Sequence, residues 1–343
     1  MTWTNARTIL KANNVPCSHG WDSTLQKLNE QDLVAHHGKV EDALIEHILC
    51  GEKFSKLYPV DPKARGAIQA KIVSLPLDEG SLSSEYPYLV SDQDLTSGDG
   101  NMSVVRVESN EDGVGAVLSS IFHVKRREEI PFADFENPKE MASRYQEVVG
   151  LTYEPMQLFH VVWMPHHRDF LEIRVDHPRG VAEADAHGMH SILKKKVNSW
   201  GCVALDQPVN LFPAVRPFYE DMDEGVVTQM TFLTTTGGIK DEKMPRRRRN
   251  ADQRTEKYHV AGRDAVEAIA IYRIAVEWSF SEDEVLYQPS VSLAASGPSG
   301  AGGRGDPTIS GALIKNCVRA ADYEFVIERL GKKAQFVPPE PQE

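Results

Sequence analysis

Three runs of cationic side chains have the type and spacing that phosphate binding requires. They are Lys125, Arg126 and Arg127; Lys194, Lys195 and Lys196; and Arg246, Arg247, Arg248 and Arg249. Guanidinium groups donate paired hydrogen bonds to phosphate oxygens, and a cluster that neutralises several phosphates gives salt-dependent affinity. The sequence therefore predicts contact with a nucleic acid, DNA or RNA, most strongly at the arginine run.

Each basic run also has an explanation that needs no ligand. The arginine run is flanked by Asp241, Glu242, Asp252 and Glu256, which balance its charge if the loop is only solvated. Docking of the same loop on an acidic neighbouring subunit is a further alternative. The lysine run closes a predicted helix, where the helix dipole favours lysine, and two glutamates directly follow the first run. These alternatives stay open.

Carboxylates and histidines offer a second chemistry, the binding of a catalytic metal. The candidate ligands are Glu172 and Asp176 on a predicted strand, His177 after it, and His187 and His190 at i and i+3 of a predicted helix. Four residues along a strand span about 13 Å, whereas paired metal ions lie about 4 Å apart. The two carboxylates therefore need ligands from other segments. A metal-dependent phosphodiesterase or nuclease is the alternative function, and whether the protein is an enzyme stays open.

A glycine-rich segment, residues 297–305, follows a predicted strand, which is where glycine-rich segments bind phosphate in many proteins. It has neither the GK[ST] ending of a P-loop nor a GxGxxG pattern that opens a helix. A flexible linker is therefore the favoured interpretation. The sequence predicts no cofactor.

Acidic residues are concentrated in a segment of their own. The chain has a formal net charge of -12, and residues 78–112 contain Arg106 as their only cation. Segregation of this kind favours contact with a charged partner. A third hypothesis is therefore a protein-binding adaptor whose acidic segment meets a basic partner or mimics the charge of nucleic acid.

The elements that position these residues indicate an α+β protein, with a helical N-terminal module followed by largely antiparallel sheet. Segments 115–124 and 158–163 are strand-like because they are rich in β-branched and aromatic residues. Residues 171–176 alternate apolar and charged side chains, which predicts an antiparallel strand with an exposed charged face. Segments 181–197 and 264–278 are predicted to be helices, the second of them buried.

The chain is long enough for about two domains, since a domain commonly holds about 150 residues. We expect a helical module at residues 1–62 and an α+β domain with the acidic loop at 63–204. A second α+β half with the basic loop follows at 205–332, and a disordered tail at 333–343. No internal repeat of fixed period divides the chain further.

Composition and cysteine usage indicate a cytoplasmic protein without membrane contact. Hydrophobic residues make up 41% of the chain and charged residues 26%, as in ordinary globular proteins. The four scattered cysteines form no CxxC pair, and the sequence shows neither a signal peptide nor a membrane span. The leading hypothesis is a non-catalytic nucleic-acid-binding or assembly subunit. It would engage nucleic acid through the arginine run, and a protein partner or a second copy of itself through other surfaces.

Overall fold

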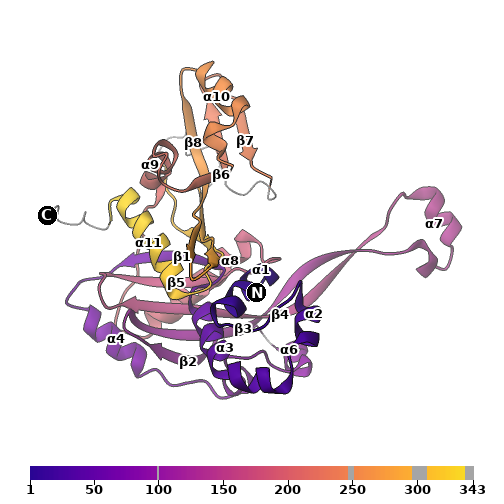
Figure 1. Cartoon of the computed structure of the whole chain (residues 1–343), viewed down its shortest axis with the longest axis vertical. Coiled ribbons are helices and arrows are strands. Elements are labelled where there is room, and N and C mark those ends of the chain that lie inside the picture. The colour runs from indigo at the N-terminus through magenta and orange to yellow at the C-terminus, as the bar shows by residue number, and fades with distance from the viewer. Residues whose placement is uncertain (99, 246–250, 296–306, 337–343) are drawn as a thin grey trace.

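An antiparallel sheet of ten strands organises the chain, in the order β2-β3-β4-β5-β1-β12-β11-β8-β6-β7 (Figure 1). The computed structural model describes residues 1–98, 100–245, 251–295 and 307–336. The strands of this sheet are β1 (Lys53–Pro59), β2 (Ser103–Ser109), β3 (Gly113–Glu129), β4 (Val149–Pro165), β5 (Phe170–Asp176), β6 (Val226–Thr234), β7 (Ile239–Lys243), β8 (Ile269–Glu277), β11 (Ser290–Ala294) and β12 (Ala312–Lys315). A separate ribbon pairs β9 (Phe280–Glu282) with β10 (Val285–Tyr287). The predicted α+β class with largely antiparallel sheet is confirmed.

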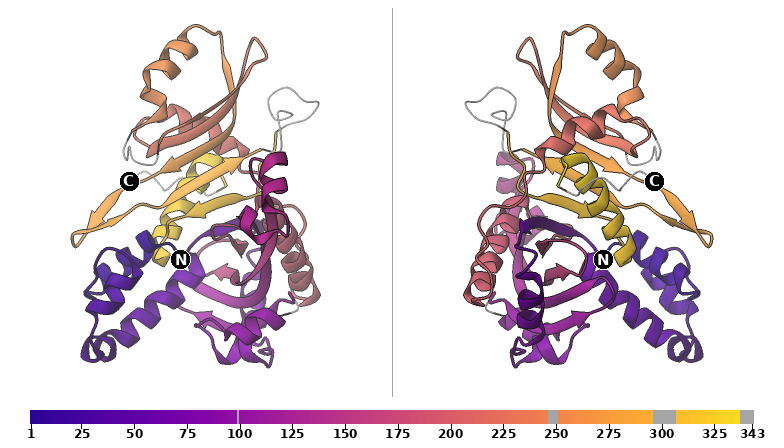
Figure 2. Two further views of the ribbon diagram at one scale, coloured as in Figure 1. Left: turned by 90° about the vertical axis from the view of Figure 1, so that its right-hand side faces the viewer. Right: turned by 90° about the vertical axis from the view of Figure 1, so that its left-hand side faces the viewer.

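Helices pack against this sheet, and three of them begin the sequence before β1 (Figure 2). The helices are α1 (Trp3–Ala12), α2 (Trp21–Lys27), α3 (Glu30–Cys50), α4 (Arg65–Val73), α5 (Ser81–Ser84), α6 (Asp92–Ser97), α7 (Pro138–Arg144), α8 (Glu183–Ser199), α9 (Val215–Glu220), α10 (Lys257–Asp264) and α11 (Ala320–Ala334). Short 3-10 turns are η1 (Phe132–Asp134), η2 (Phe212–Ala214) and η3 (Gln253–Thr255). Along the described ranges, no helix combines the length and apolar content needed to cross a membrane.

The first half of the sheet is buried on both faces, which explains the apolar runs within β3 and β4. On one face, Ile48 and Leu49 of α3 pack with Val161 of β4. On the other face, Ile68 of α4 and Leu193 of α8 belong to a larger apolar core. Strands covered on both sides need no alternation of polar and apolar residues.

Among the described residues, the apolar core of the second half of the sheet lies on one face. There, Phe218 of α9 and Ile327 of α11 are fully buried against the strands. The opposite face carries Arg273, Ala275, Ser292 and Ala294, which alternate with the core residues and are half-buried. We call this second surface the open face. It leaves polar side chains of several strands accessible beside α8.

Strands β3 and β4 continue beyond the body of the protein as a two-stranded arm, residues 125–154, whose tip carries η1 and α7 (Figure 1). Their register runs without a shift from Gly113 opposite Pro165 to Glu129 opposite Val149. The arm exposes apolar side chains, with Tyr153 63% exposed. Because an isolated two-stranded ribbon is at best marginally stable in water, a surface that covers the arm would stabilise it.

Two predictions about single elements are wrong. The charged face of β5 is buried, with Glu172 fully enclosed and Arg174 3% exposed, because Tyr323 of α11 covers it and the two charges pair. Residues 269–277 form strand β8 instead of a helix. Ile274 and Val276 are buried in the core, and the residues next to them point to the opposite face. Side chains that alternate between two faces have the period of a strand. In contrast, the helix predicted at 181–197 is confirmed as α8.

The predicted domain boundaries stay predictions, but the sheet runs across two of them. Strand β1 lies within the predicted helical module, yet it pairs with β5 on one side and β12 on the other. The pairing of β1 with β12 joins the segments before and after residue 204 into one sheet. Helix α11 continues to Ala334, just past the expected start of the tail.

Candidate functional site

The basic run on the arm is the most accessible of the basic runs in the described chain. Lys125 lies directly opposite Tyr153 in the β3–β4 register, and Arg127 lies opposite Leu151, so all four side chains share one face of the arm. Lys125 and Arg127 are exposed, and neither forms an ion pair among the described residues. Arg126 points to the other face, where it pairs with a glutamate of β4 at 2.9 Å. Two uncompensated cations therefore lie beside an exposed aromatic ring.

The lysine run of α8 is largely engaged within the protein. Nζ of Lys194 donates to the carbonyl oxygen of Asp206 at 2.5 Å, and Nζ of Lys196 donates to that of Met102 at 2.8 Å. Lys195 is exposed. Two of the three lysines thus hold neighbouring loops against the helix.

The arginine run and the acidic segment provide less evidence for a binding surface. Arg246, Arg247, Arg248 and Arg249 lie outside the described residues. In the acidic segment, Asp78 accepts a hydrogen bond from the amide of Val104 at 2.7 Å and lies 3.8 Å from Lys196. Part of that segment's charge is therefore used within the fold, and a basic partner for it stays a prediction.

The five candidate metal ligands do not come together. Glu172 and Asp176 share one face of β5, where they pair with Arg174 at 2.8 Å and Lys53 at 3.2 Å. The histidines lie on the other side of the sheet. His187 and His190 of α8 pack on the ring of Phe54, and His177 is buried with both ring nitrogens lacking a partner in the described chain. Within the described ranges, no group of three or more histidines, cysteines or carboxylates could hold a metal ion.

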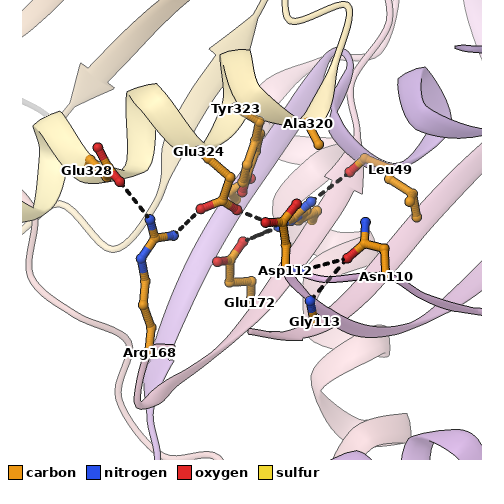
Figure 3. Close-up of polar contacts among 12 residues, drawn as sticks. Leu49, Asn110, Asp112, Gly113, Arg168, Glu172, Ala320, Tyr323, Glu324 and Glu328 are labelled. Atoms are coloured by element: carbon orange, nitrogen blue, oxygen red, sulfur yellow. Dashed lines mark hydrogen bonds and ion pairs between the residues drawn. The ribbon is translucent and has the colours of Figure 1, made fainter. Parts of the chain in front are cut away.

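The buried ion pair of β5 is the centre of a larger polar cluster (Figure 3). The guanidinium of Arg174 lies 3.9 Å from the centre of the Tyr323 ring and donates to the carbonyl oxygen of Leu49 at 3.0 Å. Glu324 of α11 lies 3.8 Å from Arg174 and also pairs with Arg168. Burial raises the pKa of Glu324, and the negative charge of Glu172 raises it further.

This cluster fits a structural role. The cavity between Trp163, Asp112 and Arg174 has a volume of about 10 Å³, which is space for a single water molecule. Trp163, whose buried indole nitrogen lacks a partner in the described chain, is one of the residues that line this cavity. The cluster connects α3, β5 and α11, and it leaves no volume for a substrate.

A much larger cavity lies where α8 meets the open face of the sheet. Its volume is about 270 Å³, and its walls include Phe54, Glu183, His187, Arg273, Thr308 and Ser310. Strands β1 and β8 and helix α8 therefore each contribute to it. Most of these side chains are polar, so the cavity suits a hydrophilic ligand.

Basic residues at and behind this cavity have lowered pKa values. His190 is buried, with Nε2 3.4 Å from the hydroxyl of Tyr58, and burial lowers its pKa to about 3, assisted by the nearby charge of Lys56. Burial, followed by Lys56, also lowers the pKa of His187. The pKa of Lys56 is itself lowered by burial and by Lys194. The lowered pKa values favour the neutral form of both histidines, and the nearby lysines carry positive charge.

Sequence reasoning found His187, His190 and Lys194 in this region and missed Lys56 and Arg273. No protein-family model, curated protein or solved structure matches this chain. Function therefore follows from residues and geometry alone. The sequence alone could have placed Lys56 on the same face of β1 as Phe54 and Tyr58, because alternate residues of a strand share a face. No local sequence pattern shows that β1 and β8 lie in the same sheet.

Proposed function

We propose that the protein is a non-catalytic nucleic-acid-binding or assembly subunit that contacts phosphates through the base of its arm and through the arginine run at 246–249. The observation that supports this most directly is the arm's exposed face, where Lys125 and Arg127 lie beside Tyr153. Cations next to an exposed ring suit a nucleic acid, because the cations neutralise phosphates and the ring stacks on a base.

The shape of the arm supports the same proposal. A two-stranded ribbon is narrow enough to enter the major groove of B-DNA, which is about 12 Å wide. The contact with phosphates would be confined to the base of the arm, because the negative charges of Glu128 and Glu129, which follow Arg127 toward the tip, repel phosphate. A single-stranded nucleic acid fits equally well, since stacking on Tyr153 needs an unpaired base.

The assembly part of the proposal rests on the apolar side chains further along the arm. Val149 is 41% exposed and Leu151 52% exposed, on the same face as Tyr153. A protein partner or a second copy of the chain would bury this stripe and stabilise the ribbon. We place this activity in the cytoplasm, a reducing compartment in which the free cysteines would remain free.

The test is binding of labelled double-stranded and single-stranded DNA and RNA over a range of about 50 to 200 mM salt. The double variant Lys125→Ala/Arg127→Ala should bind more weakly and lower the slope of log affinity against log salt by about 2. Lys139→Ala/Arg144→Ala, the same charge change at the arm's tip, is the matched control.

Two further variants separate the parts of the proposal. Replacing Arg246, Arg247, Arg248 and Arg249 with alanine should lower affinity independently of the arm variant. Tyr153→Ala should weaken binding to single strands without changing the salt slope, because a ring carries no charge. Unchanged binding in both charge variants would remove the nucleic-acid proposal, and cleavage of the probe in magnesium would show that the protein is an enzyme.

A further inference from the structure

We propose that the cavity between α8 and the open face is a binding site for a small phosphate-containing ligand that also carries hydroxyl groups. The cavity is distant in sequence from the arm and does not depend on the nucleic-acid proposal. Its volume of about 270 Å³ is near the lower limit of ordinary ligand pockets, which suits a nucleoside monophosphate or a sugar phosphate.

Basic side chains from separate elements converge on this cavity, and Arg273 and Lys56 are the charged ones among them. Arg273 of β8 and His187 of α8 line it directly. Lys56 of β1 lies immediately behind, since its Cγ is 3.1 Å from the position that a Cβ on the cavity residue Gly311 would occupy. An arginine and a lysine together offer the forked and the point-like donors with which proteins bind phosphate.

The remaining polar groups of the wall favour a ligand with hydroxyls. Thr308 and Ser310 line the cavity and present hydroxyl groups that donate to a phosphate oxygen or accept from a sugar. Glu183, at the N-terminus of α8, is the one carboxylate among the described wall residues. It repels a phosphate and accepts from a sugar hydroxyl, so it orients the ligand with its phosphate toward Arg273.

The backbone at Gly311 is what makes this arrangement possible. A Cβ there would lie 2.7 Å from the ring of Phe54, which is buried and cannot move aside. Glycine lets the segment after Thr308 lie directly on Phe54 and Lys56. The chain therefore brings the hydroxyl groups of Thr308 and Ser310 to the same cavity as Arg273, with Lys56 next to it.

The described residues on either side of the glycine-rich segment also belong to the cavity wall. Ala295 and Thr308, which precede and follow it in the sequence, both line the cavity. From the sequence, phosphate binding at residues 297–305 is disfavoured because no lysine follows the glycines. Lys56 and Arg273 supply cations at this place from distant strands, and the proposed site needs no others.

The experiment measures ligand binding to the full chain by calorimetry and by the shift in melting temperature. The probes are inorganic phosphate, ribose 5-phosphate, adenosine monophosphate and, as the uncharged counterpart, adenosine. We expect the phosphorylated sugars to bind more tightly than inorganic phosphate, and adenosine not to bind. Preference for ribose 5-phosphate or for the nucleotide would show whether a base is part of the ligand.

Variants connect binding to the cavity. Arg273→Ala and Lys56→Ala should each raise the Kd for ribose 5-phosphate at least tenfold. Lys240→Ala, which removes an exposed lysine from β7 in the same half of the sheet, should leave the Kd unchanged. If an alanine variant unfolds, Arg273→Gln and Lys56→Gln keep most of the side-chain volume and serve in its place.

A spectroscopic readout reports the location independently of affinity. Binding of a phosphate beside His187 should shift the imidazole resonances of that residue, while those of the exposed His37 stay in place. Absence of binding by every phosphorylated probe would overturn the proposal. A loss of affinity in Lys240→Ala equal to that in Arg273→Ala and Lys56→Ala would overturn it as well. So would binding that leaves the His187 resonances unmoved.

Discussion

Nδ1 of His259 lies 2.6 Å from a carboxylate oxygen of Glu242. On the other side of the same ring, Nε2 is 3.0 Å from the hydroxyl of Tyr219. With Nδ1 donating to Glu242, a neutral imidazole leaves Nε2 to accept from Tyr219. This buried relay connects three elements, the edge strand β7, helix α10 and helix α9, so it holds the edge of the sheet in place.

Breaking the relay should destabilise the protein. Glu242→Ala leaves the buried Nδ1 without its partner, which costs about 1–3 kcal/mol of unfolding free energy. Urea denaturation measures this loss, and Glu267→Ala, an exposed carboxylate nearby in the chain, serves as the control. Equal stability of both variants would mean that the hydrogen bond contributes nothing net.

Breaking the buried ion pair of Glu172 and Arg174 should lower the free energy of unfolding far more than breaking the more exposed pair of Glu328 and Arg168. Glu172→Ala leaves Arg174 buried without its closest counter-charge, which costs about 3–5 kcal/mol. Glu328→Ala removes an acid that is 56% exposed and lies 3.7 Å from Arg168, so a loss below about 1 kcal/mol is expected. Denaturant unfolding of the two variants compares these values directly, and similar losses would contradict the burial argument.

Two glycines should respond in opposite directions to alanine. Gly311→Ala forces a methyl group against the Phe54 ring and should lower the unfolding free energy by about 1–3 kcal/mol. Gly188 lies inside α8 with open space at its Cβ position, so Gly188→Ala should raise stability by about 0.5–1 kcal/mol. Thermal melts of both variants test this, and a destabilised Gly188→Ala would show that the helix surface is not free.

Stability should fall as the solution is acidified below the ordinary histidine pKa of about 6.5. Burial lowers the pKa of His160 to about 4 in the folded protein. Between these values the unfolded chain binds a proton that the folded chain does not, so unfolding becomes easier as pH falls. The variant His160→Asn removes this titrating group. Its side chain keeps an acceptor for the backbone amide of Asp176, which donates to Nδ1 of His160 at 3.2 Å in the natural chain.

The variant His160→Asn should therefore show a shallower dependence of unfolding free energy on pH. The expected change in slope is at most about 1.4 kcal/mol per pH unit, the value for one proton. Chemical denaturation at several pH values between 7 and 4 measures it. A slope equal to that of the natural chain would assign the acid sensitivity to other groups, of which His47 and His190 are the next candidates.

Local patterns in the sequence predicted α8 and β5 correctly but gave a helix where β8 lies. The position of α8 follows from acidic residues in its first turn and basic residues in its last, both of which interact with the helix dipole nearby. Likewise, the alternation at 171–176 identified β5 as a strand. That pattern could not show which surface covers the charged face, because α11, which supplies Tyr323, comes much later in the chain.

The candidate cavity was only partly predictable for the same reason. His187 and Lys194 are close in sequence, and helical periodicity alone places them near each other. Arg273 joins them only through the pairing of β8 with β11, β11 with β12 and β12 with β1. Strand order in an antiparallel sheet depends on contacts between distant segments, and no residue pattern in β8 identifies its neighbours.

The central position of β1 has a consequence for how the chain is made. Lys53 pairs with Ile314, so β1 gains its second neighbour only after the segments that contain β2 to β11 have been synthesised. Contacts between segments so far apart slow folding, and an unpaired strand edge promotes aggregation in the meantime. Nascent chains in which β12 has not yet been synthesised therefore cannot complete the sheet, and we expect them to be clients of chaperones and targets of proteases.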